Sequence, residues 1–185
     1  MKTKIVSVIG LGYIGLPTAA LLASKGYSVR GVDLNPGVAA IVNQGKTHIL
    51  EPDLDALVRS AVTDGYLSAS TLPQAADVYI ICVPTPFREA EGVPQPRLDY
   101  VFDATRSLAS MLKPGDIVIL ESTSPVGTTE QMERVLRELG VNVNEIHIAY
   151  CPERVLPGKI MVELVENDRI VGGMTPTATV AVAGF

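Results

Sequence analysis

Three glycines with the spacing Gly10-x-Gly12-x-x-Gly15 separate two apolar runs, KIVSVI before them and PTAALLAS after them. The first run is typical of a buried strand and the second of a helix. Gly10 allows a tight turn, Gly12 lets a pyrophosphate approach the backbone, and Gly15 lets the helix pack closely on the strand. The amides and the positive dipole end of the helix N-terminus also attract anions. The spacing therefore predicts a phosphate-binding loop.

An acidic residue follows this loop at an informative distance. The expected second strand, YSVRGVD, ends in Asp33, eighteen residues after Gly15. A G-x-G-x-x-G motif alone is a weak signal, but an acid at this distance is where the ribose-binding carboxylate of NAD-binding domains is expected. Residues 34–45 contain no Lys or Arg, so a 2′-phosphate would meet Asp33 without a neighbouring cation. The pattern predicts NAD rather than NADP as the cofactor.

The first residues allow a competing interpretation as a secretory signal peptide. MKTK is basic, and a nearly uncharged stretch follows as far as Lys25, which is typical of such signals. Three glycines and Pro17 interrupt the stretch, and no convincing small-residue cleavage site follows it. No window of about 18 purely apolar residues is present, so we expect no membrane span.

Composition places the chain among globular proteins. Its 185 residues suffice for one sizeable domain, and 47% hydrophobic with 19% charged residues are ordinary values. A net charge of −5 without a basic run argues against a nucleic acid partner. The two cysteines, Cys82 and Cys151, lack the spacing of a metal site and require no oxidising compartment. We therefore expect no bound metal and a cytoplasmic location.

Strand and helix patterns alternate along the chain, which is typical of a parallel sheet covered on both faces. Strands are expected near residues 4–9, 27–33, 67–70, 78–84, 116–122 and 145–151, and helices near 14–25, 36–43, 53–65, 99–112 and 130–139. Asn35 and Asp99 are expected to cap helices, and Thr128 with Gln131 has the spacing of a capping box. The predicted fold is α/β, a doubly wound Rossmann-type parallel sheet with helices on both faces.

Two further stretches of sequence stand apart from this alternation. Residues 84–98, PTPFREAEGVPQPRL, contain four prolines and are expected to form a loop. Its base, residues 83–86, follows a central strand and is expected to line the cofactor crevice, whereas its tip fits a solvated surface excursion equally well. Thr175 and Pro176 begin a helix pattern that is cut after about ten residues. We therefore expect an NAD-binding domain over residues 1–174, with residues 175–185 leading into a further region of a longer protein.

Several separate motifs resemble the UDP-glucose/GDP-mannose dehydrogenase family. They are the glycine loop, VPTPF, ILESTSPVGTTE and AYCPERVLPGK, and the resemblance extends over residues 3–176. Relatives that act on UDP-glucose carry Asn-Pro-Glu-Phe where this chain has Cys151-Pro152-Glu153-Arg154. Together with VLPGK and MVELVENDR, this sequence looks like the mannosamine branch of the family.

The resemblance implies a reaction and its participants. The family oxidises the primary alcohol of a sugar nucleotide to a carboxylate with two NAD in succession. The implied substrate is a UDP-sugar, UDP-N-acetyl-D-mannosamine in this branch, and the full-length protein is expected to be a homodimer. The family's acid/base lysine and nucleophilic cysteine come from later segments, so we expect this chain alone to be inactive. A dehydrogenase for another UDP-hexose or UDP-hexosamine, or a non-catalytic nucleotide-sensing module, remains an alternative.

The resemblance also assigns roles to individual residues. The pyrophosphate is expected at Gly10, Gly12, Tyr13, Ile14 and Gly15, the adenosine ribose at Asp33, and the nicotinamide end at Thr85 and Thr123. Thr123 and Glu153 are the expected catalytic residues, with Glu153 activating the water that hydrolyses a thioester, and Arg154 and Val155 are expected to contact the sugar nucleotide. Two alternatives stay open: Thr123 as a strand-end hydroxyl that satisfies the backbone, and Glu153 as a residue that merely caps or pairs with Arg154 at the surface. Cys82 is interpreted as a packing residue. Cys151 is nearer the site but does not occupy the position of the family's nucleophile, so neither cysteine is expected to be catalytic.

Overall fold

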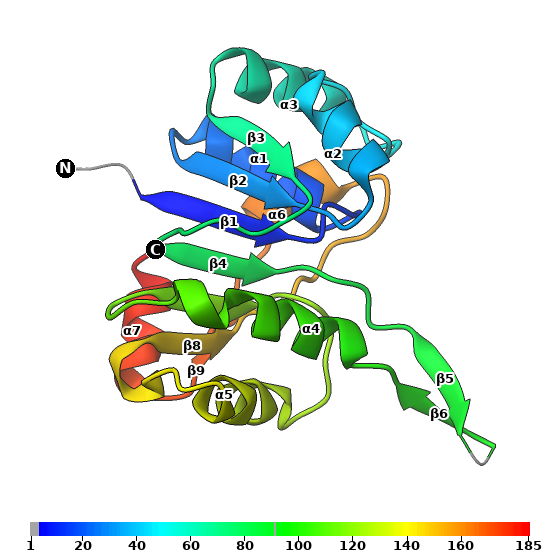
Figure 1. Cartoon of the computed structure of the whole chain (residues 1–185). Coiled ribbons are helices and arrows are strands. Elements are labelled where there is room, and N and C mark those ends of the chain that lie inside the picture. Colours follow the sequence, from blue (N-terminus) through cyan, green and yellow to red (C-terminus); the bar gives the residue numbers. More distant parts are fainter. Residues whose placement is uncertain (1–3, 91) are drawn as a thin grey trace.

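A seven-stranded sheet forms the centre of the molecule (Figure 1). The computed structural model describes residues 4–90 and 92–185, so the basic start of the chain at residues 1–3 lies outside the described residues. The strand order is β3-β2-β1-β4-β7-β8-β9. The strands are β1 Ile5–Ile9, β2 Ser28–Val32, β3 Leu67–Ser70, β4 Val78–Ile81, β7 Ile117–Leu120, β8 His147–Tyr150 and β9 Gly172–Gly173. All neighbours pair in parallel except β8 and β9, which are antiparallel.

Within residues 4–90 and 92–185, seven α-helices connect and cover these strands. They are α1 Gly15–Ser24, α2 Pro36–Asn43, α3 Leu54–Thr63, α4 Asp99–Leu108, α5 Thr128–Glu138, α6 Ile160–Glu166 and α7 Pro176–Ala183. Two are capped as their sequences predict. The Asn35 side chain accepts a hydrogen bond from the amide of Gly37, and Thr175 accepts one from Ala178, each directly before a proline at the first helical position.

The sheet has one hydrophobic core on each face because its strands are apolar throughout. Along β4, Val78 and Ile80 belong to the core under α1, α3 and α7, whereas Tyr79 and Ile81 belong to the core under α4 and α5. Period-two alternation of apolar residues toward two covered faces is the expected pattern of a parallel sheet. This arrangement confirms the predicted doubly wound α/β fold.

Two predicted helix caps are wrong. Asp99 is the first residue of α4 and forms an ion pair with Arg97 at 3.0 Å, without capping the helix. At α5 the N-cap position belongs to Gly127, which has a φ of 90°. The Thr128 hydroxyl donates to the Pro125 carbonyl, and the Gln131 amide donates to the Gly127 carbonyl. A glycine in left-handed conformation shifts the helix start by one residue, so the capping-box register is lost.

The proline-rich stretch is not a simple loop. Its residues form a two-stranded antiparallel hairpin, β5 Phe87–Ala90 and β6 Val93–Pro96. Figure 1 shows this hairpin projecting from the body of the protein on the side of the strands' carboxyl ends. A proline cannot donate to a sheet ladder, but a ribbon with two free edges tolerates prolines whose N position faces outward.

Three central strands are shorter than predicted, and besides the hairpin the elements α6 and β9 were not predicted. β4 ends at Ile81, so Cys82 follows the strand and is not part of it. β7 and β8 likewise end at Leu120 and Tyr150, before the polar residues of their motifs. The short helix α6 and the two-residue strand β9 have too few residues to produce a periodic pattern. All three shortened ends lie at the edge where a cofactor is expected.

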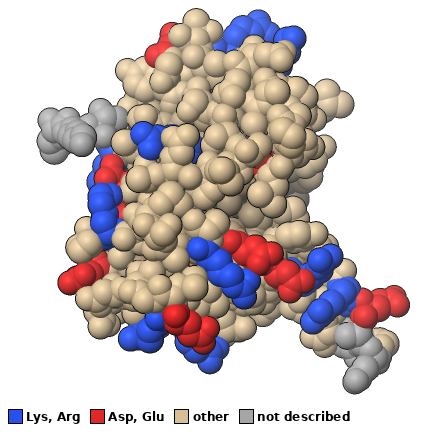
Figure 2. All heavy atoms as spheres, viewed as in Figure 1, with Lys and Arg blue, Asp and Glu red and all other residues tan. Residues whose placement is uncertain are grey.

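Charged side chains of both signs lie side by side on the surface shown in Figure 2, along α4 and on the hairpin. Arg106 and Asp103 on α4 form an exposed ion pair at 2.8 Å. Within the described residues, no helix is long and apolar enough to cross a membrane.

Candidate functional site

The glycine loop joins the carboxyl end of β1 to the first turn of α1. Gly10 has a φ of 90°, and a Cβ atom there would lie 2.7 Å from the Cys82 carbonyl oxygen. A Cβ atom on Gly15 would lie 1.8 Å from the Gly10 carbonyl oxygen. Both glycines are therefore required for close packing against the protein's own backbone. Gly10 is also required for its left-handed backbone conformation.

Gly12 differs from its two neighbours. A Cβ atom there would meet no heavy atom within 4 Å, and the residue is exposed. The fold itself gives no reason for a glycine at this position. A missing side chain that serves no internal contact keeps space open outside the loop, as a bound pyrophosphate requires. The N-terminus of α1 has no side-chain cap and no acidic residue in its first turn, which suits an anion.

Asp33 lies at the carboxyl end of β2 and contacts the glycine loop. Its Oδ2 accepts a hydrogen bond from the amide of Leu11 at 3.1 Å, and its Oδ1 accepts one from the amide of Asn35 at 2.9 Å. These two bonds fix the carboxylate beside the loop that it is predicted to serve. Each oxygen keeps a further lone pair, so the carboxylate can also accept hydrogen bonds from ribose hydroxyls.

Hydroxyl groups tie together the ends of β4 and β7. The Thr85 hydroxyl donates to the Thr123 carbonyl at 2.8 Å. The Ser122 hydroxyl contacts the carbonyl oxygens of Ile81 at 3.2 Å and Val83 at 2.8 Å. These bonds fix the separation of the two strand ends, and with it the width of the crevice where the predicted nicotinamide end lies.

These groups line one cleft of about 410 Å³, which lies in the range of about 300–1,000 Å³ that is usual for ligand sites. Eight of the predicted site residues line it: Gly10, Gly12, Tyr13, Ile14, Asp33, Thr85, Thr123 and Glu153. The predicted residues Gly15, Arg154 and Val155 are absent from the lining. The structure therefore brings the predicted cofactor residues and Glu153 to one place at the carboxyl edge of the sheet, where such folds hold ligands.

Glu153 follows β8 and is partly buried. Its carboxylate accepts a hydrogen bond from the amide of Val155, and its own amide donates to the Glu121 carbonyl at 3.3 Å. Burial raises the pKa of Glu153 above its ordinary value, and the nearby Glu121 carboxylate adds to that shift. A carboxyl group with a raised pKa exchanges protons more readily near neutral pH, as a general base requires.

Arg154 and Val155 lie on the segment that leads away from the cleft. Arg154 is exposed, and its guanidinium points to the Asp168 carbonyl at 3.5 Å. Its neighbour Glu153 bonds the Val155 amide instead, so these two residues do not form the surface ion pair that was one alternative above.

Comparison with known proteins identifies the chain. Residues 4–184 match the model of the UDP-glucose/GDP-mannose dehydrogenase family, NAD binding domain. The chain belongs to the UDP-glucose/GDP-mannose dehydrogenase family. The matched part of the family is its NAD-binding domain, which confirms the cofactor predicted from the glycine spacing and Asp33.

Individual members of the family are similar over nearly all of this chain. The UDP-N-acetyl-D-mannosamine dehydrogenase of Campylobacter jejuni is 56% identical in an alignment 179 residues long that covers 92% of this chain and 44% of that protein. An NDP-N-acetyl-D-galactosaminuronic acid dehydrogenase of Ralstonia nicotianae is 52% identical in an alignment 187 residues long that covers 96% of this chain and 44% of that protein. A solved structure of UDP-D-ManNAc dehydrogenase from Pyrococcus horikoshii has a TM-score of 0.92 at 40% identity. The match covers 97% of this chain and 43% of that one. The chain thus spans less than half the length of these family members.

One charged residue that sequence reasoning missed, Glu121, also lines this cleft. Glu121 follows β7, is 1% exposed, and forms an ion pair with Arg169, which lies outside the cleft lining. Desolvation lowers the pKa of Arg169, but the Glu121 carboxylate outweighs this effect and raises it. The available signal was a single carboxylate directly after the apolar run IVIL, because an acid at a buried position requires a partner. Its partner Arg169 is 48 residues away in the sequence, and no motif around Arg169 indicates the pairing.

Both cysteines are buried free thiols. Cys82 lies beside the cleft, and its Sγ donates a hydrogen bond to Glu121 Oε2 at 3.0 Å. Burial raises the pKa of the Cys82 thiol well above its ordinary value, and the Glu121 carboxylate raises it further. Among the residues that the structure describes, no cluster of three or more His, Cys, Asp or Glu side chains is arranged to hold a metal ion.

Proposed function

We propose that this chain is the NAD-binding part of a longer enzyme that oxidises UDP-N-acetyl-D-mannosamine to UDP-N-acetyl-D-mannosaminuronate with two NAD. One observation carries the proposal: Glu153 lines the same cleft as Gly12 and Asp33. A nucleotide-binding module alone needs the loop and the ribose acid, but it does not need a partly buried carboxylate with a raised pKa at the nicotinamide side. The similarity to proteins named UDP-N-acetyl-D-mannosamine dehydrogenase supports the substrate.

The proposed cofactor contacts follow from where the residues lie. Gly10, Gly12, Tyr13 and Ile14 bind the pyrophosphate, with Gly15 holding α1 close beneath them. Asp33 accepts hydrogen bonds from the adenosine ribose and disfavours the 2′-phosphate of NADP, while Thr85 and Thr123 receive the nicotinamide end. NAD, when bound there, supplies the hydride acceptor for each of the two oxidations. The chain's own residues orient the cofactor and, through Glu153, handle a proton.

We assign Glu153 to the last step of the reaction. The substrate carbon is then joined to the enzyme as a thioester, through a cysteine outside this chain. Glu153 takes a proton from water as its oxygen attacks the thioester carbon, and the C–S bond breaks to release the uronate and the thiol. Thr123 assists from the adjacent strand end, and Arg154 and Val155 contact the sugar nucleotide when the rest of the enzyme closes the site.

We propose the following arrangement of the whole protein. Residues 1–174 form the NAD-binding domain, and α7, which begins at Pro176 with Thr175 as its N-cap, leads into the remaining region. The full-length enzyme is a homodimer, and it acts in the cytoplasm, where free thiols such as Cys82 and Cys151 stay reduced.

A second substrate is favoured by a specific observation. Relatives named NDP-N-acetyl-D-galactosaminuronic acid dehydrogenase are 51–52% identical to this chain, nearly as similar as the mannosamine enzymes. The second candidate function is therefore the oxidation of an N-acetyl-D-galactosamine-type sugar nucleotide by the same chemistry.

The test is a substrate comparison with the full-length protein. NADH formation is measured with UDP-N-acetyl-D-mannosamine, UDP-N-acetyl-D-galactosamine, UDP-N-acetyl-D-glucosamine and UDP-glucose. We expect the first to be preferred, with two NADH formed per sugar. Preference for the galactosamine nucleotide would establish the second candidate, and no NADH with any of the four would refute both.

The Glu153 assignment has its own test in the full-length protein. Glu153→Gln should leave NAD affinity nearly unchanged and slow turnover by about 10²–10⁴-fold, the usual contribution of a general base. Mass spectrometry of the quenched variant should then detect a covalent enzyme–sugar adduct. Normal turnover without an adduct would show that Glu153 has no part in hydrolysis.

A further inference from the structure

Glu121 occupies an unusual position between two cavities. It lines the cofactor cleft, and it also lines a second, apolar cavity of about 390 Å³ between α1, α6 and α7. The apolar walls of the second cavity include Leu21, Leu22, Ile80, Ile119, Leu164, Val182 and Phe185. A carboxylate that is 1% exposed between such surfaces is costly unless every oxygen is hydrogen-bonded.

The hydrogen bonds of Glu121 go to residues directly beneath the glycine loop. Its Oε2 accepts from Cys82 Sγ at 3.0 Å and from the Thr18 hydroxyl at 3.3 Å. The Cys82 Cβ atom lies 3.0 Å from the place of a Cβ atom on Gly15, so Cys82 supports the loop from below. Thr18 lies in the first turn of α1, the helix whose N-terminus faces the cleft. The Glu121 carboxylate therefore links Cys82 and Thr18, the two residues that support the loop.

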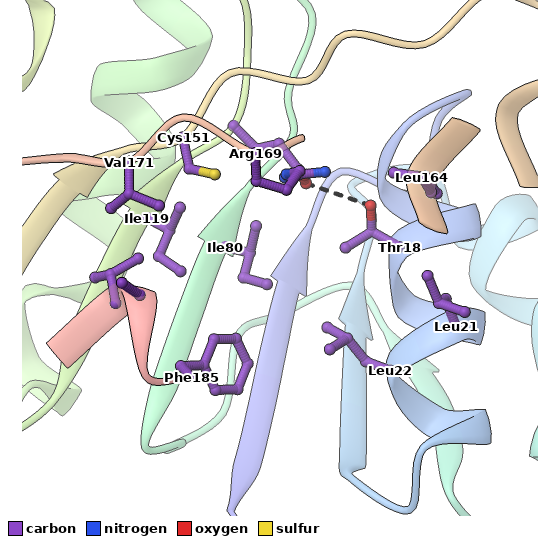
Figure 3. A pocket seen from close by; sticks show the side chains of 13 residues that line it. Thr18, Leu21, Leu22, Ile80, Ile119, Cys151, Leu164, Arg169, Val171 and Phe185 are labelled. Carbon is purple, nitrogen blue, oxygen red and sulfur yellow. Dashed lines mark hydrogen bonds and ion pairs between the residues drawn. The ribbon is translucent and has the colours of Figure 1, made fainter. Parts of the chain in front are cut away.

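Arg169 completes this group from the other side. Its guanidinium is paired with Glu121 Oε1, and its side chain is 35% exposed. In Figure 3, Arg169 lies over one end of the second cavity, and a dashed line marks the hydrogen bond between Thr18 and the carboxylate. Arg169 belongs to the segment between α6 and β9, so the pair links that segment to the support of the loop.

We propose that Glu121 is a positioning residue for the phosphate-binding loop, and that Arg169 holds its carboxylate in place. Glu121 acts through Cys82 and Thr18, and it keeps the amides of residues 10–15 in the arrangement that binds a pyrophosphate. This inference goes beyond the proposed function, because it depends on NAD binding by this cleft and on no particular sugar.

The test compares two variants of the 185-residue chain. Arg169→Met leaves a buried carboxylate without its partner, and such losses are strongly destabilising. The double variant Glu121→Met/Arg169→Met replaces the pair by flexible apolar side chains of similar length and should recover most of the lost stability. Its NAD affinity should nevertheless stay below that of the wild type, because the loss of Glu121 removes the acceptor of Cys82 and Thr18.

The expected result is an NAD Kd about five- to tenfold above that of the wild type in the double variant, the change that corresponds to one ordinary hydrogen bond. Amide hydrogen exchange of residues 10–15, measured without cofactor, should accelerate by a similar factor. A wild-type Kd together with wild-type exchange would reduce the pair to a purely structural role and overturn the proposal. Because the exchange needs no NAD, it decides the question even if the cleft binds another nucleotide.

Two conservative substitutions at Thr18 test the proposal with little risk of misfolding. Thr18→Val removes one hydroxyl donor with little change of shape, whereas Thr18→Ser keeps it. We expect Thr18→Val to weaken NAD binding about two- to fivefold and Thr18→Ser to restore most of the loss. Equal affinities for the two variants would contradict the proposal. Arg59→Met, in the exposed Arg59–Asp55 pair on α3, is the matched control and should change neither measurement.

Discussion

At the scale of single residues, the three loop glycines have separable functions. Gly10 and Gly15 are held by contacts with the protein's own backbone, whereas Gly12 faces open space. A glycine required only by a ligand can be replaced without affecting the fold, and a glycine required by packing cannot.

The first prediction compares Gly12→Val with Gly15→Ala. Gly12→Val should abolish detectable NAD binding and change the free energy of unfolding by no more than about 0.5 kcal/mol, as for a typical surface substitution. Gly15→Ala should cost about 1–3 kcal/mol or more, because its Cβ atom has no room. Calorimetric titration measures the NAD affinity of both variants, and chemical unfolding measures their free energies of unfolding. Retained NAD affinity in Gly12→Val would show that the pyrophosphate does not lie over this residue.

The second prediction concerns the pH dependence of stability at Glu153. Burial raises the pKa of this carboxyl above its ordinary value of 4.5. Its contribution to stability is therefore present below about pH 4.5 and is lost as the pH rises through the folded-state pKa. Glu153→Gln does not titrate, so the variant should gain stability relative to the wild type as the pH rises from about 4.5 through the folded-state pKa.

Urea unfolding across this pH range measures the difference. Glu138→Gln, an exposed acid on α5, controls for the change in net charge. A difference between Glu153→Gln and wild type that stays constant with pH would mean that the carboxyl is not perturbed by its surroundings.

Residues of the site were predictable from the sequence where local geometry determines them. The glycine spacing and Asp33 are fixed by one turn and one strand, and both lie where they were expected. Glu121 was not predictable as a site residue, because its partners Thr18, Cys82 and Arg169 lie 39 to 103 residues away in the chain. Only the fold brings such residues together.

At the scale of elements, buried glutamate Glu51 connects two segments that are distant in sequence. Its Oε1 accepts a hydrogen bond from the amide of Ile160 at 2.7 Å, and its Oε2 accepts one from the amide of Gly158 at 2.8 Å. These amides belong to the first turn of α6 and the residues before it. The segment that carries Arg154 and Val155 is thus held at its far end by a residue between α2 and α3.

The third prediction is that Glu51→Gln loosens this segment. A glutamine offers one acceptor oxygen and turns an amide donor toward the second backbone amide, so the cost should be about 1–3 kcal/mol of unfolding free energy. Amide exchange at residues 158–160 should accelerate, while that of the glycine loop should not. Asp55→Asn, exposed on α3, makes the same charge change as a control. Unchanged exchange at residues 158–160 would show that α6 is held by its apolar contacts alone.

The elements differ in how well the sequence predicts them. Apolar runs such as VYII and IVIL identify buried strands, since a strand covered on both faces contains no polar interruption. The hairpin of residues 87–96 was missed because its prolines are typical of loops, and α6 because seven residues are too few for a clear period. Both elements depend on their surroundings more than on intrinsic preference.

At the scale of the whole molecule, one cleft gathers eight of the predicted site residues but few groups that could react with a substrate. None of the described residues that line the cleft is a lysine. The only cysteine in that lining, Cys82, is 8% exposed and bonded to Glu121. Because the thiolate is the nucleophile and burial raises the pKa of this thiol, Cys82 stays protonated and unreactive.

The last prediction follows from this combination: the 185-residue chain should bind NAD and form no NADH from UDP-N-acetyl-D-mannosamine. Binding should raise the melting temperature as NAD is added, in proportion to RT ln(1 + [NAD]/Kd), whereas absorbance of NADH should stay at baseline. The full-length protein under the same conditions is the positive control. NADH formation by the purified chain would contradict the prediction, and loss of that activity in Cys82→Ser would locate the unexpected nucleophile. A chain that binds NAD without turnover would mean that the lysine and the thiolate must be supplied from outside it, while the cleft fixes where they have to meet the substrate.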